Sequence, residues 1–211
     1  MSEPVRHPIF ARVYERLSGD EEHSGEVEHR RELLAGLHGR VIEIGAGNGL
    51  NFRFYPDTVT EVVAVEPEGY LRERARERAS ESAAPVTLVD GLADALIADD
   101  SSFDAAVASL VLCSVADQSA ALAEIRRVLR PDGELRFYEH VLAEGKGFAR
   151  MQRLLSKIWP IIGGGCHPDR DTAAAIADAG FTIDSCRRFD FTPSPLVYPL
   201  KPKILGRARA G

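Results

Sequence analysis

An acidic residue and three glycines lie close together in the stretch Glu43-Ile44-Gly45-Ala46-Gly47-Asn48-Gly49, which continues a short apolar run. Glycines at the end of a strand permit a tight turn and let the backbone approach a ligand closely. Glu66 comes 21 positions after Gly45, at the end of the next apolar run. A carboxylate there can accept hydrogen bonds from both ribose hydroxyls of an adenosine cofactor. The pattern predicts such a cofactor at the carboxyl ends of two strands.

A dinucleotide is a weaker alternative for this site. Its fingerprint, G-x-G-x-x-G, would need a third glycine at position 50, where this chain has Leu50, and the glycines fall at 45, 47 and 49 instead. The spacing therefore speaks against a nicotinamide-dependent oxidoreductase.

Two histidines stand where a general base could act. His140 follows an apolar run, and His167 lies in the glycine-rich loop Gly163-Gly164-Gly165-Cys166-His167-Pro168. Histidine can take up a proton near neutral pH. Structural roles remain open for both: His140 as a hydrogen-bonded residue at a strand end, and His167 as a residue that orders the following helix.

The spacing of apolar residues predicts the elements that must position these groups. Short apolar runs predict strands at 41–44, 61–65, 86–89, 103–112 and 134–140. Helical spacing and turn signals predict the intervening and flanking elements. They are helices at 9–17, 26–37, 68–82, 119–129, 147–159 and 171–179, a turn at 130–133, and final strands at about 181–189 and 203–209. Strands alternating with helices indicate an α/β fold with a mostly parallel sheet.

The glycine stretch, led by Glu43, resembles motif I of the class I S-adenosylmethionine-dependent methyltransferases. Phe103–Ser109 resembles the fourth-strand motif of that superfamily, and Glu124–Leu135 resembles its signature around strand five. The resemblance implies a Rossmann-like fold: a seven-stranded sheet with an antiparallel C-terminal hairpin and helices on both faces. It also implies S-adenosylmethionine as cofactor, in contact with Tyr14, Glu43, Gly45, Ala46, Gly47, Gly49, Asn51, Glu66, Pro67, Leu92 and Leu110.

One loop departs from the superfamily pattern. After the third predicted strand the superfamily usually has G-D-A-E, and its aspartate binds the adenine amino group. This chain has Gly91-Leu92-Ala93-Asp94, so Leu92 occupies the aspartate position and could contact adenine only by packing or through its backbone.

A narrower resemblance is to the methyltransferase-like 7 group, which includes alkyl thiol S-methyltransferases. It is carried by Asn51–Pro56, Leu110–Val115, Tyr138–Val141 and Gly165–His167. This resemblance implies methyl transfer to a small, apolar acceptor, a thiol among the candidates. Two alternatives remain: a phospholipid amine N-methyltransferase, and a protein that binds the cofactor without catalysis.

We expect the acceptor pocket to be covered by segments outside the core sheet. Residues 1–38 are predicted to form helices that cap the active site, and residues 39–211 the cofactor-binding core. The cover is expected from the first helix, around Phe10 and Tyr14, and from the loop 163–168, whose consecutive glycines would let it move as a gate.

Composition limits the partners and the location. The net charge of −6 argues against a nucleic-acid partner. Cys113, Cys166 and Cys186 have no zinc-site spacing, so we predict no metal, and Cys113 and Cys166 are interpreted as small apolar fillers. Reduced thiols and the absence of an apolar run long enough to span a bilayer favour a cytoplasmic protein that touches membranes peripherally at most. The sequence leaves the oligomeric state open.

Overall fold

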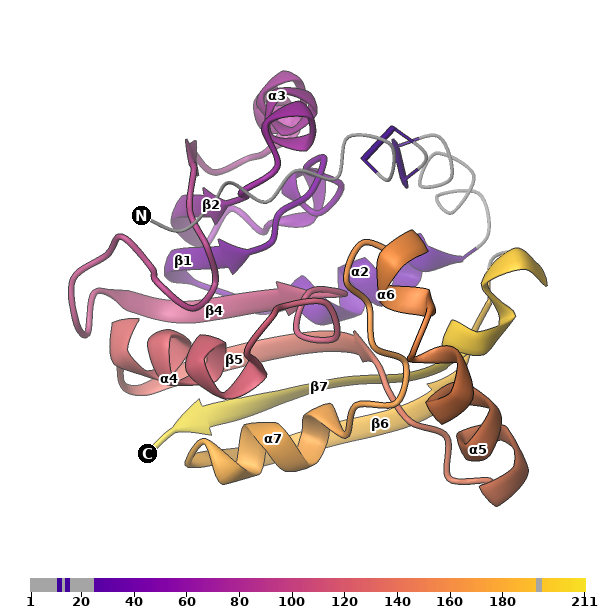
Figure 1. The fold of residues 1–211 in the computed structure, drawn as a ribbon. Helices are drawn as coiled ribbons and strands as arrows, with labels where there is room; N and C mark the ends of the chain where they lie inside the picture. The colour runs from indigo at the N-terminus through magenta and orange to yellow at the C-terminus, as the bar shows by residue number, and fades with distance from the viewer. Residues whose placement is uncertain (1–10, 13, 16–24, 193–194) are drawn as a thin grey trace.

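The computed structural model describes residues 11, 12, 14, 15, 25–192 and 195–211. Its centre is a seven-stranded sheet with the order β3-β2-β1-β4-β5-β7-β6 (Figure 1). The pairs among the first five strands of this order are parallel, whereas β7 pairs antiparallel with both β5 and β6. The strands are β1 (Gly39–Ile44), β2 (Val59–Val65), β3 (Val86–Val89), β4 (Phe103–Ser109), β5 (Leu129–His140), β6 (Phe181–Asp190) and β7 (Pro202–Ala210).

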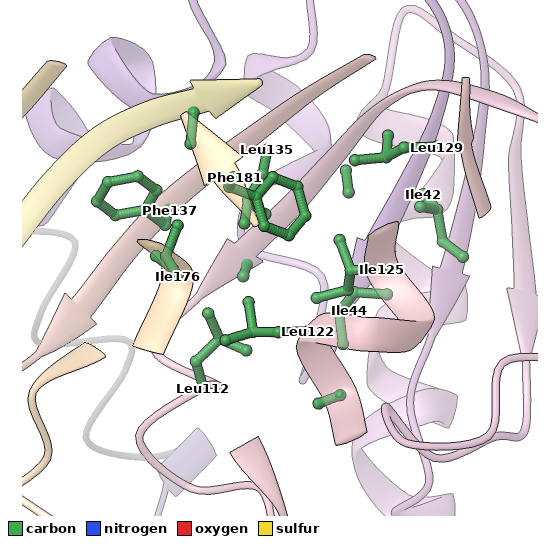
Figure 2. Close-up of a cluster of buried hydrophobic side chains, with 14 of the residues drawn as sticks. Ile42, Ile44, Leu112, Leu122, Ile125, Leu129, Leu135, Phe137, Ile176 and Phe181 are labelled. Carbon is green, nitrogen blue, oxygen red and sulfur yellow. The ribbon is translucent and has the colours of Figure 1, made fainter. Parts of the chain in front are cut away.

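Helices cover both faces of the sheet because its central strands are apolar on both sides. Ile42 and Ile44 of β1 pack into a core with Leu122 and Ile125 of one helix and Ile176 of another (Figure 2). Val41, on the opposite face of β1, packs into a second core. The helices are α2 (Glu26–Leu34), α3 (Gly69–Arg78), α4 (Gln118–Val128), α5 (Lys146–Leu155), α6 (Trp159–Ile162) and α7 (Thr172–Asp178), with short 3₁₀ segments at Phe52–Phe54, Ala79–Glu81 and Pro195–Leu200.

The two cores place α4 and α7 on one face and α2 and α3 on the other. Side-chain caps fix where several of these helices begin. Asp117 accepts from the N–H groups of Ser119 and Ala120 at the start of α4, and Asp171 accepts from Ala174 at the start of α7. The α/β fold class and the antiparallel C-terminal hairpin expected from the sequence are confirmed.

Several predicted elements are shorter in the structure. The helix predicted at 68–82 is α3, which ends at Arg78 and is followed by a 3₁₀ segment. Strand β4 ends at Ser109 rather than at 112, because Leu110 turns to a left-handed conformation with φ of 58°. Helix α2 ends at Leu34 rather than at 37, because the chain becomes extended at Ala35 and left-handed at Gly36.

Two other predictions are corrected near prolines. Strand β5 begins at Leu129 instead of 134, since Leu129 already pairs with Phe103; the predicted turn at 130–133 is an irregularity within this strand. The helix predicted at 147–159 is two helices, α5 and α6. Pro160 lies in the first turn of α6, where its missing N–H is tolerated; within one continuous helix that N–H would be needed for a bond to the Ser156 oxygen.

The helix predicted at 9–17 lies largely outside the described residues. Residues 11, 12, 14 and 15 are helical, and Phe10 is among the residues that the structure does not describe. Across the described part of the chain, no helix combines the length and the apolar character that crossing a membrane requires.

Candidate cofactor and acceptor site

The glycine loop after β1 depends on the conformational freedom of its glycines. Gly45, Gly47 and Gly49 have φ of 62°, 57° and 82°, a region that other residues rarely adopt. Gly45 also lacks room for a side chain, since a Cβ there would lie 2.3 Å from Cγ2 of Val111. The loop therefore passes directly against the segment that follows β4.

Glu66 joins this loop to the end of β2. One carboxylate oxygen accepts a 2.8 Å hydrogen bond from the backbone N–H of Gly47, and the other accepts from that of Glu68 at 2.9 Å. The side chain is 6 % exposed, and burial raises the pKa of the Glu66 carboxyl although these N–H donors oppose the rise. Glu66, the residue predicted to bind the ribose, therefore lies against the glycine loop.

Glu43 and Asn51 lie beneath the loop and bind each other. The Asn51 amide donates to one oxygen of Glu43 at 2.7 Å, and the Tyr55 hydroxyl donates to the other at 2.8 Å. Arg30 of α2 donates to the amide oxygen of Asn51. Burial raises the pKa of Glu43 to about 7. Because both Glu43 oxygens are occupied within the protein, its side chain holds the loop in place.

Of the other predicted cofactor residues, Tyr14, Ala46 and Pro67 lie in or beside this loop, and Leu92 lies in the connection after β3. A Cβ on Gly47 would lie 3.6 Å from the Tyr14 ring, so the first helix passes over the loop here. Pro67 directly follows Glu66 and is half-buried, whereas Ala46 is buried and donates its backbone N–H to Val65 of β2. Leu92 lies after β3, where it forms an isolated bridge with Ala95.

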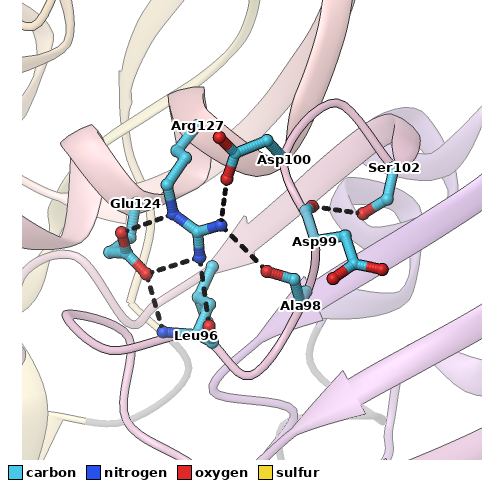
Figure 3. A network of polar contacts seen from close by, with 7 residues as sticks. All are labelled: Leu96, Ala98, Asp99, Asp100, Ser102, Glu124 and Arg127. Carbon is cyan, nitrogen blue, oxygen red and sulfur yellow. Dashed lines mark hydrogen bonds and ion pairs between the residues drawn. The ribbon is translucent and has the colours of Figure 1, made fainter.

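Arg127 of α4 fixes the connection between β3 and β4, in which Leu92 lies (Figure 3). Its guanidinium donates to Glu124, to Asp100 and to the backbone oxygens of Leu96 and Ala98. Glu124 in turn accepts from the Leu96 N–H. Helix α4 therefore holds the far end of the connection in which Leu92 lies.

Glu139, which sequence reasoning missed, organises the segment after β4. Its buried carboxyl accepts from the backbone N–H groups of Val111, Leu112 and Cys113 at 2.9–3.1 Å. Leu110, a predicted cofactor contact, donates its own N–H to the Tyr138 oxygen. Burial raises the pKa of Glu139 well above its ordinary value. The signal in the sequence is an acid that follows the apolar pair Phe137 and Tyr138 and directly precedes His140.

His140 lies between two cysteines that the sequence separates widely. Its Nδ1 is 3.5 Å from Cys113 Sγ and 3.7 Å from Cys166 Sγ. Burial, and then the charge of Lys203, lower the pKa of His140 well below its ordinary value. The contact with Cys166 and burial raise the pKa of the Cys113 thiol. The imidazole is therefore neutral near pH 7 and is directed at sulfur.

The backbone of His167 binds the segment that follows β4. Its N–H donates to the Cys113 oxygen at 2.8 Å, and Arg170 donates to the oxygens of Leu112 and Val115. Gly165 is so close that a Cβ on it would lie 2.7 Å from the Ser114 oxygen. The His167 side chain is partly exposed, and burial lowers its pKa. The loop 163–168 therefore lies beside the ends of β4 and β5.

A surface depression of about 860 Å³ lies elsewhere, between α4, α7 and the C-terminus. Its lining includes Gln118, Arg126, Arg130, Ala179 and Gly211, and no predicted cofactor or acceptor residue. It is therefore separate from the site described above.

Comparisons with known proteins identify the family of the chain. Residues 42–137 match the family model described as a methyltransferase domain. Over 208 residues the chain is 34 % identical to thiol S-methyltransferase TMT1B from Rattus norvegicus, covering 95 % of this chain and 82 % of that protein. A second relative, phosphatidylethanolamine N-methyltransferase from Cereibacter sphaeroides, is 28 % identical over 127 residues, covering 59 % of this chain and 62 % of that protein.

A solved structure extends the comparison to the fold. A SAM-dependent methyltransferase from Thermotoga maritima superposes with a TM-score of 0.69 at 23 % identity, covering 96 % of this chain and 97 % of the other. The fold, the glycine loop with Glu66 and the similarity along nearly the whole chain all indicate the same family. The chain belongs to the class I S-adenosylmethionine-dependent methyltransferases, in the same family as thiol S-methyltransferase TMT1B.

Proposed function

We propose that this enzyme transfers the methyl group of S-adenosylmethionine to the sulfur of a small, apolar thiol. The observation that carries the acceptor class is the similarity to thiol S-methyltransferase TMT1B along 95 % of the chain. The sulfurs of Cys113 and Cys166 lie near the ends of β4 and β5, which is consistent with a site for a soft, apolar acceptor.

In this proposal the cofactor lies along the carboxyl ends of β1 and β2. Glu66 accepts hydrogen bonds from the ribose hydroxyls, Gly45 to Gly49 face the methionine part, and Tyr14 binds its carboxylate. Pro67, Leu92 and Leu110 pack around the adenosine. Glu43 and Asn51, whose polar atoms bind one another, support the loop from below.

The cofactor supplies a methyl group bound to a positively charged sulfur. The protein has to align the acceptor with that methyl group and exclude water, because alignment alone can supply much of the acceleration. A thiol, with a pKa of about 8.5, is partly ionised at neutral pH and needs less help from a base than a phenol with a pKa of about 10. The low pKa of His140 agrees with a site that does not depend on a strong base.

We further propose that residues 1–38 and the loop 163–168 cover the acceptor, with His167 orienting or deprotonating it. If so, His167→Ala should lower kcat by about a hundredfold or more for a phenol and less for a thiol. The cofactor dissociation constant should stay unchanged. Single-turnover rates and calorimetry measure the two quantities separately, and equal loss with both acceptors would argue against proton transfer at His167.

The leading alternative is methylation of a phospholipid amine, which the shorter match to phosphatidylethanolamine N-methyltransferase favours. A protein that binds the cofactor without turnover is a second alternative. Cytoplasmic location remains a prediction from the sequence.

Incubation with cofactor carrying a deuterated methyl group separates these functions. The purified protein would receive alkyl thiols, phenols, amines and phosphatidylethanolamine vesicles in separate reactions, with product masses read by mass spectrometry. The proposal expects labelled methyl thioethers at rates well above the other products. Preferential labelling of the lipid amine would replace it, and no labelled product from a protein that binds the cofactor would support the non-catalytic alternative.

A further inference from the structure

Cys113, His140 and Cys166 form a group of metal-ligating side chains beside the predicted cofactor site. One donor atom from each residue lies within 4.8 Å of the others. The sulfurs are 3.5 Å and 3.7 Å from Nδ1 of His140. The two cysteines are buried and reduced, whereas His140 is partly exposed. The group therefore reaches solvent at the histidine.

These separations fit a tetrahedral zinc ion. Zinc lies about 2.3 Å from thiolate sulfur and about 2.0–2.1 Å from histidine nitrogen, so tetrahedral angles put sulfur and nitrogen about 3.6 Å apart. The two observed distances lie on either side of that value. The two sulfurs lie within 4.8 Å of each other, and tetrahedral zinc would put them about 3.8 Å apart, so an ion could bind with at most about 1 Å of movement between the sulfurs.

Hydrogen bonds that do not involve the sulfurs hold the two cysteine-bearing segments against each other. Glu139 binds the N–H of Cys113, and the N–H of His167 binds the Cys113 oxygen. Arg170 joins the two cysteine-bearing loops through its contacts with Leu112 and Val115. A site whose ligands are positioned before the ion arrives loses less entropy on binding.

The group is open and close to the cofactor loop. Among the described residues it comprises three His, Cys, Asp or Glu side chains, one fewer than a closed zinc site uses. Val111, two residues before Cys113, packs against Gly45 of the glycine loop. A fourth coordination position at this site would lie on the side of the sheet edge where we expect the acceptor, and its ligand could exchange.

We propose that Cys113 Sγ, Cys166 Sγ and His140 Nδ1 bind Zn²⁺, and that the acceptor thiol takes the fourth position. The second part rests on the proposed function. The two cysteines release their protons when the ion binds, and the acceptor releases its proton to solvent on coordination. The acceptor sulfur then donates an electron pair to the methyl carbon as the bond from that carbon to the sulfonium breaks. The neutral thioether that results leaves the ion, and no electrons are exchanged with the metal.

The first part can be tested with Co²⁺, which reports thiolate ligation by a sulfur-to-metal absorption band. Full-length protein stripped with a chelator would be titrated with Co²⁺ and then with Zn²⁺, which should displace it. Wild type and Cys186→Ser, a control in an exposed cysteine, should bind one ion per chain. Because each variant loses a direct ligand, Cys113→Ser and Cys166→Ser should bind at least about a hundredfold more weakly.

A measurement on the wild type alone guards against variants that do not fold. Calorimetry of Zn²⁺ binding in buffers of different ionisation enthalpy should show release of two protons per ion, whereas a site without thiolates releases none. The proposal is overturned if wild type lacks the sulfur-to-cobalt band, if Cys113→Ser keeps it, or if peptide mapping of fresh protein finds Cys113 and Cys166 joined as a disulfide.

The second part is tested by adding 1-hexanethiol, or 1-hexanol as control, to the cobalt protein. The thiol should intensify the sulfur-to-cobalt band and the alcohol should not. A spectrum unchanged by thiol overturns the open-position role while leaving the metal site intact. If the thiol shifts the spectrum but is not methylated, the proposed function fails and the coordination stands.

Discussion

Two buried carboxyl groups on neighbouring strands serve different purposes at the residue scale. Both oxygens of Glu43 bind side chains beneath the glycine loop, whereas those of Glu66 bind backbone N–H groups at its edge. The sequence placed both acids in the cofactor set. The sequence could not assign the two acids different roles, because the path of the folded loop determines that Asn51 and Tyr55 bind Glu43.

Glu43 should make the stability of the protein depend on pH. Its pKa is about 7 in the folded state against an ordinary value of 4.5, with burial the main cause. Between these values the folded protein keeps a proton that the unfolded chain has lost, so the free energy of unfolding falls as pH rises. The full effect is about 3 kcal/mol, complete once pH exceeds the folded pKa.

Urea unfolding of wild type and Glu43→Gln between pH 4.5 and 8 measures this effect. The glutamine variant cannot titrate, so its stability relative to wild type should increase across the interval. Parallel pH profiles for the two proteins would mean that Glu43 is not the group responsible.

At the element scale, the site depends on loops that leave the strands abruptly. The sequence predicted the strands around the site, since buried apolar runs mark them. It placed the end of β4 too late, because Leu110 to Leu112 are apolar like the strand itself. What ends the strand is the left-handed Leu110 and the Glu139 carboxyl, a contact between residues 26–28 positions apart.

Gly45→Ala should disrupt the contact between two of these loops. The left-handed backbone costs about 1–2 kcal/mol for a residue with a side chain, and the new Cβ would collide with Val111. We expect a loss of at least about 2 kcal/mol in the free energy of unfolding together with weaker cofactor binding. Thermal and urea unfolding measure the first and calorimetry the second.

Gly69→Ala is the matched control for this substitution. Gly69 begins α3, and no atom lies within 4 Å of the position that its Cβ would take. Its replacement should be neutral or stabilise by up to about 1 kcal/mol. A Gly45 variant as stable as this control would contradict the close approach of the two loops.

At the scale of the whole molecule, the site is assembled from distant parts of the chain. Cys113 and Cys166 are 53 positions apart, and neither has metal-site spacing in the sequence, yet the fold brings both to His140. Only the docking of the loop 163–168 on the segment after β4 creates this group. The sequence predicted that this loop would lie on the acceptor side, but not which atoms it would meet.

A buried ion pair joins α2 to the C-terminal hairpin. Lys203 of β7 lies 2.6 Å from a Glu26 oxygen and 2.8 Å from the Tyr138 hydroxyl, with both charged side chains 2 % exposed. Burial alone would raise the pKa of Glu26, but Lys203 and Arg30 hold it below the ordinary value. The same helix carries Arg30, which binds Asn51 beneath the glycine loop.

Lys203→Met should therefore destabilise the whole protein by about 3–5 kcal/mol near neutral pH, because Glu26 would stay buried without its partner. The double variant Glu26→Gln with Lys203→Met should recover much of the loss. Urea unfolding of wild type, the two single variants and the double variant gives the free energy of coupling between the two charges. Additive effects would show that the two charges do not stabilise each other.

We propose that the glycine loop and Glu66 hold the methyl donor, and calorimetric titration with S-adenosylhomocysteine tests this role most directly. Hydrogen bonds to a charged group contribute about 1.5–3 kcal/mol each, so Glu66→Ala should weaken binding at least tenfold while circular dichroism shows the fold intact. NAD should not compete. An unchanged dissociation constant in the folded variant, or tighter binding of NAD by the wild type, would contradict the account.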